Sequence, residues 1–181
     1  MNTDPDRSGQ AGALTVLTPI APGAEPDLRA YLGGLRAGPS PLARLPRTHF
    51  GRWVIVAELV PEKDEPEPDH LAGPYLLFTA SFDGAVDTYL DQLCDELAAQ
   101  AQEIWGRCTG APQPAAGAPL KAYLRANHHK TGFFVAAYPK ATVGKVRAAL
   151  AQRDDAIAFA RDAQSMEPAQ LQAAFLDRLG G

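Results

Sequence analysis

The chain has 181 residues with a formal net charge of −4, and 46% of its residues are hydrophobic. This length suits one domain with extensions, and the composition excludes wholesale disorder, collagen and a coiled coil. Basic residues are scattered and form no patch for phosphates, so we expect no nucleic-acid partner. No stretch approaches the roughly 20 apolar residues of a membrane span. The N-terminus also lacks a secretory signal, so we expect a cytoplasmic protein with no membrane partner.

The first part of the chain predicts a strand followed by a helix. Residues 1–11 are polar and predict a flexible tail. Residues 13–20 alternate between apolar and polar side chains, which is the pattern of a strand. Pro26 is suited to the first turn of a helix, and residues 28–35 place apolar side chains at helical spacing.

The next part predicts two strands that pair with each other. Residues 48–59 and 75–82 are rich in β-branched and aromatic side chains, which favour strands. Between them, residues 61–73 are acidic and proline-rich, and this segment is predicted to be an exposed loop. A single loop connects the two strands, so they are predicted to be antiparallel.

The second half predicts a long helix, a loop and a fourth strand. Apolar residues step by three or four from Val86 to Ile104, which predicts one helix ending near Gly106. Residues 108–119 form a second loop, rich in proline, alanine and glycine, and a short helix follows it. Residues 131–138 are aromatic and β-branched and predict a strand. A helix up to residue 150 precedes a helical extension over 151–181.

The predicted order is strand, helix, strand, strand, helix, strand. This βαββαβ order is the ferredoxin-like split unit, an α+β fold in which two helices cover one face of an antiparallel sheet. We therefore expect a domain over residues 12–150 and a C-terminal helical extension over 151–181.

In this element order, residues 13–150 resemble the ferredoxin-like superfamily and its dimeric α+β-barrel proteins. That resemblance implies a homodimer, and a small-molecule pocket between each sheet and its helices. Residues 48–56, 76–84 and 104–108 also resemble uncharacterised bacterial segments associated with haem peroxidase- and catalase-like proteins. The resemblance implies oxidative chemistry, with haem or without a cofactor, but assigns no functional residue.

His49 and Arg52 are the first candidate site residues. In a regular strand His49 shares a face with Trp53, where it would act as an acid, a base or a haem ligand. The favoured alternative is a structural histidine at the end of a strand, either hydrogen-bonded or solvated. Arg52 lies on the opposite face among apolar neighbours, where a charge needs a partner. We expect an ion pair with Asp83 or Asp87, and the minority hypothesis is a ligand carboxylate.

The remaining histidines and the cysteines predict no metal site. His128 and His129 are adjacent and would face opposite sides of a strand, so we expect a solvated turn there. The alternative places one of them near His49 in space, where the two would form a haem or metal ligand set. Cys94 is predicted to be a core residue, and Cys108 lies at a helix end that would not activate a thiolate.

Two hypotheses for function follow. The first is a ligand-binding domain with an apolar pocket for a small apolar or carboxylate ligand, and it leaves catalysis undecided. The second is a non-catalytic protein-interaction module, in which aromatic side chains such as Phe78 pack in the core. The first hypothesis names these ligand-binding residues: His49, Arg52, Trp53, Phe78, His128 and Tyr138.

Overall fold

A computed structural model describes residues 4–60 and 70–179. The chain divides into two compact units, residues 1–143 and 144–181. Most of the acidic, proline-rich segment predicted at 61–73 lies outside the described residues. The described part contains six α-helices and a four-stranded antiparallel sheet, so the predicted α+β class is confirmed. None of these helices is long and apolar enough to cross a membrane.

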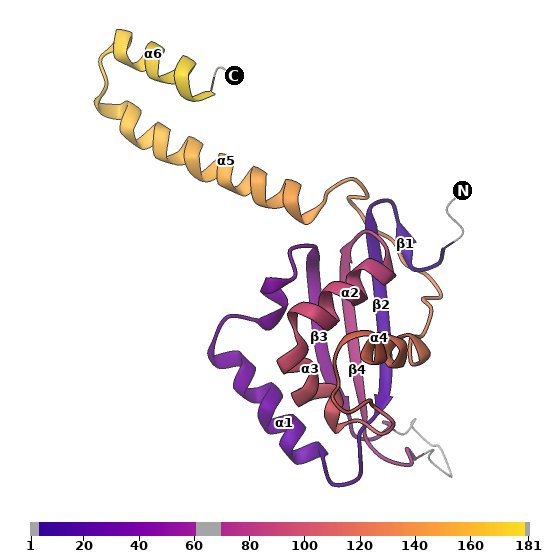
Figure 1. Ribbon diagram of the computed structural model, residues 1–181. Coiled ribbons are helices and arrows are strands. Elements are labelled where there is room, and N and C mark those ends of the chain that lie inside the picture. The colour runs from indigo at the N-terminus through magenta and orange to yellow at the C-terminus, as the bar shows by residue number, and fades with distance from the viewer. Residues whose placement is uncertain (1–3, 61–69, 180–181) are drawn as a thin grey trace. The chain divides into compact units, whose positions relative to one another are not determined.

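The sheet has the strand order β1-β2-β4-β3, and every neighbouring pair is antiparallel (Figure 1). Its strands are β1 (Arg7–Ser8), β2 (Ala11–Pro19), β3 (Thr48–Val56) and β4 (Tyr75–Asp83). The three longer strands confirm the predicted ones, and β3 and β4 form the predicted antiparallel pair. Because β2 and β3 both run antiparallel to β4, they are parallel to each other with β4 between them.

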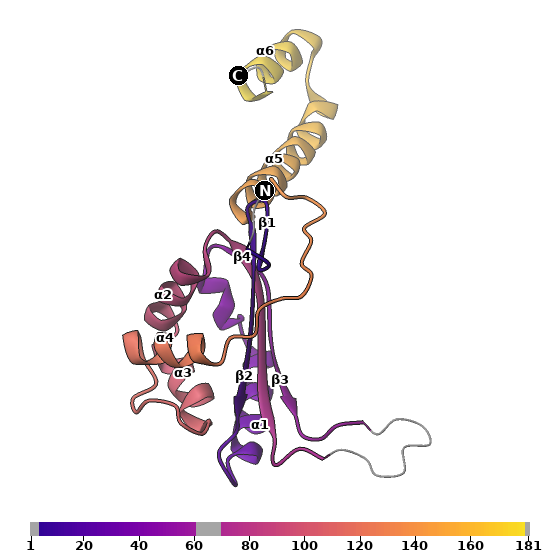
Figure 2. The same cartoon turned by 90° about the vertical axis from the view of Figure 1, so that its right-hand side faces the viewer.

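Four helices cover one face of this sheet. They are α1 (Glu25–Gly34), α2 (Val86–Glu96), α3 (Ala98–Ile104) and α4 (Gly117–Ala126). Figure 2 shows α2, α3 and α4 together on one side of the strands. The predicted single helix over 86–106 is divided at Leu97, whose backbone leaves the helical region with ψ 21° while its side chain stays in the core.

The two faces of the sheet differ because side chains alternate along each strand. In β4 the residues Leu76, Phe78, Ala80 and Phe82 are buried under the helices, and the residues between them are partly exposed. The core therefore lies between the sheet and the helices. The opposite side of the sheet, which we call the open face, is covered by no helix among the described residues of the first unit, 4–60 and 70–143 (Figure 2).

The predicted fourth strand over 131–138 is wrong. Pairing with β2 occurs a few residues earlier, where the Leu17 amide donates to the Asn127 carbonyl at 3.1 Å and the His129 amide donates to the Thr15 carbonyl at 2.8 Å. Residues 131–138 then take an irregular path, and side chains rather than a neighbouring strand bond two of their amides. Asp6 Oδ1 accepts from Thr131 N at 2.7 Å, and the Ser8 hydroxyl oxygen accepts from Ala136 N at 3.0 Å.

Residues 4–11 are fixed to the rest of the first unit, which differs from the flexible tail expected there. β1 pairs with β2, and the Asp6 side chain is buried between these strands and the segment after α4. Gly9 has φ +63°, and a Cβ at that position would collide with the carbonyl oxygen of Pro139. The N-terminal segment therefore belongs to the domain.

The second unit is a helical hairpin. It contains α5 (Val143–Asp162), whose first residue belongs to the first unit, and α6 (Pro168–Leu179), so the predicted domain boundary at residue 150 falls inside α5. The Phe159 and Phe175 ring centroids lie 6.2 Å apart, and Arg178 forms a bidentate ion pair with Asp155.

Candidate functional site

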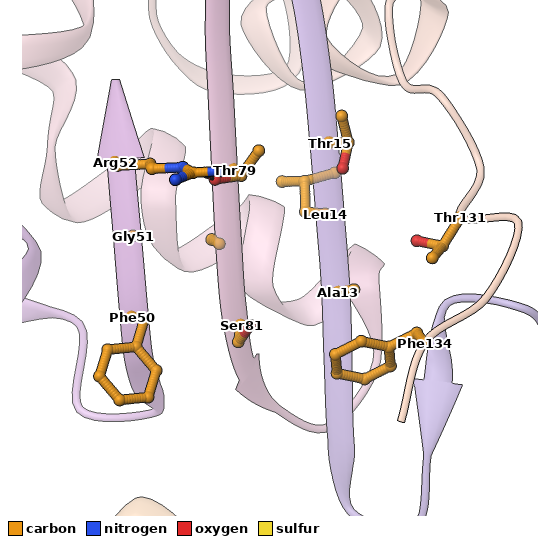
Figure 3. Close-up of a pocket in the computed structure, with 11 residues that line it drawn as sticks. Ala13, Leu14, Thr15, Phe50, Gly51, Arg52, Thr79, Ser81, Thr131 and Phe134 are labelled. Atoms are coloured by element: carbon orange, nitrogen blue, oxygen red, sulfur yellow. Dashed lines mark hydrogen bonds between the residues drawn. The ribbon is translucent and has the colours of Figure 1, made fainter. Parts of the chain in front are cut away.

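The open face of the sheet carries a hollow of about 510 Å³ (Figure 3). Strands β2, β3 and β4 form its floor, and the segment after α4 contributes Thr131 and Phe134 beside β2. The strand register explains which side chains meet there. Arg52 pairs with Thr79, and Thr79 pairs with Thr15, so a guanidinium and two hydroxyls lie in one row across three strands. The adjacent row places Phe50 opposite Ser81.

Arg52 has no carboxylate partner in the part of the chain that the structure describes. Its Nε donates to Thr79 Oγ1 at 3.1 Å, and its side chain is exposed on the open face. The predicted ion pair with Asp83 or Asp87 is wrong, because these carboxylates bind His49 and Arg125 instead. A guanidinium has five N–H donors in a planar fork, so Arg52 keeps donors for a further acceptor.

His49 lies at the start of β3, next to a β-bulge between Thr48 and Phe50. Its Nε2 is 2.8 Å from Asp83 Oδ1, and the side chains of this pair are 20% and 13% exposed. The other carboxylate oxygen of Asp83 accepts from the backbone N–H of Val143 at 2.8 Å. His49 is therefore a hydrogen-bonded histidine at the end of a strand, as the structural alternative expected.

His128 forms an isolated bridge with Val16 of β2 and does not line the hollow; its side chain is buried in a separate depression. Its side chain is 6% exposed, and its Nε2 is 3.4 Å from Oδ2 of Asp6, which is 3% exposed. Burial lowers the pKa of His128, and the nearby Asp6 carboxylate opposes that shift. The expected solvated turn is therefore wrong for His128, although His129 is exposed as predicted.

The aromatic candidates lie in different places. The Trp53 ring stacks on Phe78 with centroids 5.2 Å apart, and Phe78 meets Trp105 at 5.4 Å. Phe78 and Trp105 are fully buried, so they fill the space between the sheet and the helices. Tyr138 is 80% exposed in the irregular segment after α4. Of the six predicted ligand-binding residues, Arg52 alone lines the hollow on the open face.

Sequence reasoning missed most of the residues that surround Arg52. The strand pattern places Phe50 next to Arg52 on the same face. The pattern does not link Thr79, Ser81 or Phe134 to Arg52. The signal in β4 is a period of two, because Thr79 and Ser81 alternate with Phe78 and the other buried residues. For Phe134 no such signal exists, because its segment is irregular.

The described residues contain no group of three or more histidine, cysteine, aspartate or glutamate side chains that could hold a metal ion. Cys94 and Cys108 are free and buried, and burial raises the pKa of each thiol to about 11. This agrees with the predicted core position of Cys94 and with an unactivated Cys108. Comparisons of the chain with protein-family models, curated proteins and solved structures find no match.

Proposed function

We propose that this domain binds a small molecule with a carboxylate group and an apolar body on the open face of its sheet. One observation carries the proposal: Arg52 is an exposed guanidinium without a carboxylate partner among the described residues, and it lines a hollow together with two aromatic rings. Arginine binds carboxylates with two parallel hydrogen bonds, which fixes the orientation of the ligand. Phe50 and Phe134 supply the apolar contacts.

The lining favours binding over a specific reaction. Its polar groups are Arg52 and the hydroxyls of Thr15, Thr79, Ser81 and Thr131, with no histidine, cysteine, lysine or carboxylate in the lining. These groups orient an anion, but none of them is an ordinary general base near neutral pH. The residues that line the hollow include no axial haem ligand, so this site does not fit a haem group. The link to oxidative chemistry stays a prediction from the resemblance.

The fold supports a ferredoxin-like assignment within the α+β class. α1 lies in the connection between the parallel strands β2 and β3, and β4 is inserted between them, which is the split βαβ arrangement. Residues 127–129 follow α4 and bond to β2, at the free side of the first long strand. This is the position of a fourth strand, shortened to one bridge.

A second copy of the chain is the partner that we propose for the open face. Phe50 is 78% exposed and Val54 is 38% exposed, on the same face as the partly exposed Leu77. Contiguous apolar side chains on a sheet face mark interaction sites. A two-fold dimer through this face would enclose the two copies of the hollow between the sheets, where a ligand would be shielded from water.

The test is a titration with naphthalene-1-acetate, followed by amide NMR shifts. We expect shifts at Thr15, Thr79 and Ser81, and no comparable binding of the neutral naphthalene-1-acetamide. A hydrogen bond to a charged group contributes about 1.5–3 kcal/mol, so Arg52→Gln should weaken binding by roughly 10- to 150-fold. Arg52→Lys keeps the charge but not the planar fork and should retain part of the affinity.

Equal binding of the acid and the amide, or an unchanged affinity in Arg52→Gln, would refute the carboxylate site. Native mass spectrometry of protein purified without added cofactor tests the dimer separately and reports any co-purified ligand. Phe50→Asp should yield monomers, because it would place two carboxylates in the proposed interface. A wild-type protein that stays monomeric at all concentrations would refute the dimer. The carboxylate site would then still be tested by the ligand titration.

A further inference from the structure

The outer edge of β3 borders a second groove, which shares Gly51 and Arg52 with the lining of the proposed carboxylate site. β3 ends the sheet order, so no strand of the described chain pairs with its outer side. Figure 1 shows α1 and the segment that follows it next to β3, and a groove of about 530 Å³ lies between them. We call it the β3 groove and define it by these residues: Arg29, Leu32, Leu35, Arg36, Leu42 and Trp53.

The edge of β3 lacks three of the features that protect many edge strands. Natural edges carry proline, lysine or a bulge that prevents pairing with another chain. Residues 48–56 contain neither proline nor lysine, and the bulge lies at the start of the strand, between Thr48 and Phe50. Gly51–Val56 continues in regular register with β4. At about 3.3 Å per residue, the N–H and C=O groups on the outer side of this stretch are available for pairing over roughly 20 Å.

The rim of the groove is positively charged. The side chain of Arg36 forms no ion pair or hydrogen bond with any residue that the structure describes. Arg29 bonds Glu25 at 2.6 Å, in an exposed pair of the kind that contributes little to stability. Arg52 lies where the groove meets the open face and also lacks a carboxylate partner among the described residues. This cluster of arginines occurs in a chain whose net charge is −4, so it is a local feature.

The wall and floor of the groove are apolar. Leu32, Leu35 and Trp53 are partly exposed, and Leu42 is buried against Gly51 of β3. A side chain at Gly51 would collide with Leu42, so glycine allows this segment to lie close to the strand. The groove therefore combines an unpaired strand edge, apolar contacts and positive charge along one line.

We propose that the β3 groove binds an extended acidic peptide segment of a partner protein, which adds a strand to the sheet at β3. Backbone hydrogen bonds to Gly51–Val56 provide the pairing. Alternate side chains of the added strand face the two sides of the sheet, so its glutamates face α1, with their methylene groups against Leu32 and Leu35, and its apolar residues face the other side. Its carboxylates pair with Arg29 and Arg36, and this charge pattern sets the preference for an acidic partner.

The probe is a fluorescein-labelled peptide of about twelve residues that alternates glutamate with valine or threonine, followed by fluorescence anisotropy with the full chain. We expect saturable binding that weakens with added salt, and no binding of a peptide with lysine in place of glutamate. The Arg29→Gln, Arg36→Gln double variant should bind about five- to tenfold more weakly. The double variant Arg147→Gln, Arg161→Gln changes the net charge equally on α5 and should bind like the wild type.

Strand pairing is tested with two N-methylated peptides, one modified at odd and one at even positions. In an added strand only alternate amides face β3, so one peptide should lose binding and the other should keep it. Equal affinity of both, equal binding of the lysine peptide, or no binding at about 1 mM would overturn the proposal. Arg52 stays intact throughout, and naphthalene-1-acetate binding to the double variant shows separately whether the open-face site is functional.

Discussion

Phe78 and Phe50 lie on opposite faces of the same sheet, and truncating each to alanine should have opposite consequences. Phe78 is fully buried between Trp53 and Trp105, whereas Phe50 is 78% exposed beside the open-face hollow. The two substitutions remove the same atoms. Their difference therefore reports which face holds the core and which face is free to bind.

The magnitude for Phe78→Ala follows from its burial. Truncating a buried phenylalanine costs about 3–5 kcal/mol, and the loss of two aromatic contacts places this site toward the upper end. Domains are stable by roughly 5–15 kcal/mol, so the variant should fold with a much smaller margin. With a slope of about 2 kcal/mol per molar urea, the unfolding midpoint should fall by roughly 1.5–2.5 M. Phe50→Ala should change the free energy of unfolding by less than about 0.5 kcal/mol.

The assay is equilibrium unfolding in urea, followed by far-UV circular dichroism and by tryptophan emission. Both tryptophans of the chain contact Phe78, so emission should report this region directly. Ligand affinity should respond in the opposite way to stability. Phe50→Ala should weaken the binding of naphthalene-1-acetate, because it removes a wall of the hollow, whereas Phe78→Ala should not. A midpoint shift below about 0.5 M for Phe78→Ala, or an equal shift for both variants, would refute the reasoning.

Three further outcomes are expected. Asp83→Ala should lower the free energy of unfolding by about 1–2 kcal/mol, because the N–H of Val143 and the ring of His49 lose their acceptor. Thermal unfolding measures this loss, and an unchanged Tm would contradict the prediction. Burial raises the pKa of Cys94 and Cys108 to about 11, so a thiol reagent at about pH 8 should label them only as fast as the protein unfolds. Rapid labelling of the native protein would contradict their burial. Burial lowers the pKa of His128, so the unfolded state binds its proton more readily and stability should fall as the pH drops from about 7 to 5. His128→Gln should flatten that dependence, and an unchanged slope in urea titrations would show that another group carries it.

Much of the sheet could be predicted because its strands follow a period of two. In β4, Phe78 and its buried neighbours alternate with Thr79 and Ser81, and this pattern shows both the strand and its faces. Residues 131–138 have the composition of a strand without its hydrogen bonds, and the side chains of Asp6 and Ser8, more than 120 positions away, bond the amides of Thr131 and Ala136. Composition cannot reveal such distant partners.

The candidate site was predictable only in part for a related reason. The sequence indicates that Arg52 shares a face with Phe50, and the structure confirms this. The expected partner of Arg52 was wrong because a β-bulge near His49 and the position of Val143 bring other groups to Asp83. Pattern analysis treats strands as regular, so it misassigns partners wherever a bulge changes the alternation.

The bonds between the first residues and the segment after α4 have a consequence for synthesis of the chain on the ribosome. Asp6 and Thr131 are 125 positions apart, and Ser8 and Ala136 are 128 apart. At about 5–20 residues per second, the N-terminal residues wait roughly 6–25 s for these partners to be made. During that interval the Asp6 carboxylate and the Ser8 hydroxyl lack the amides of Thr131 and Ala136, and the side of β2 that later pairs with residues 127–129 is unpaired. The nascent chain therefore exposes this edge to chaperones, or to other nascent chains, until almost the whole first unit has been translated.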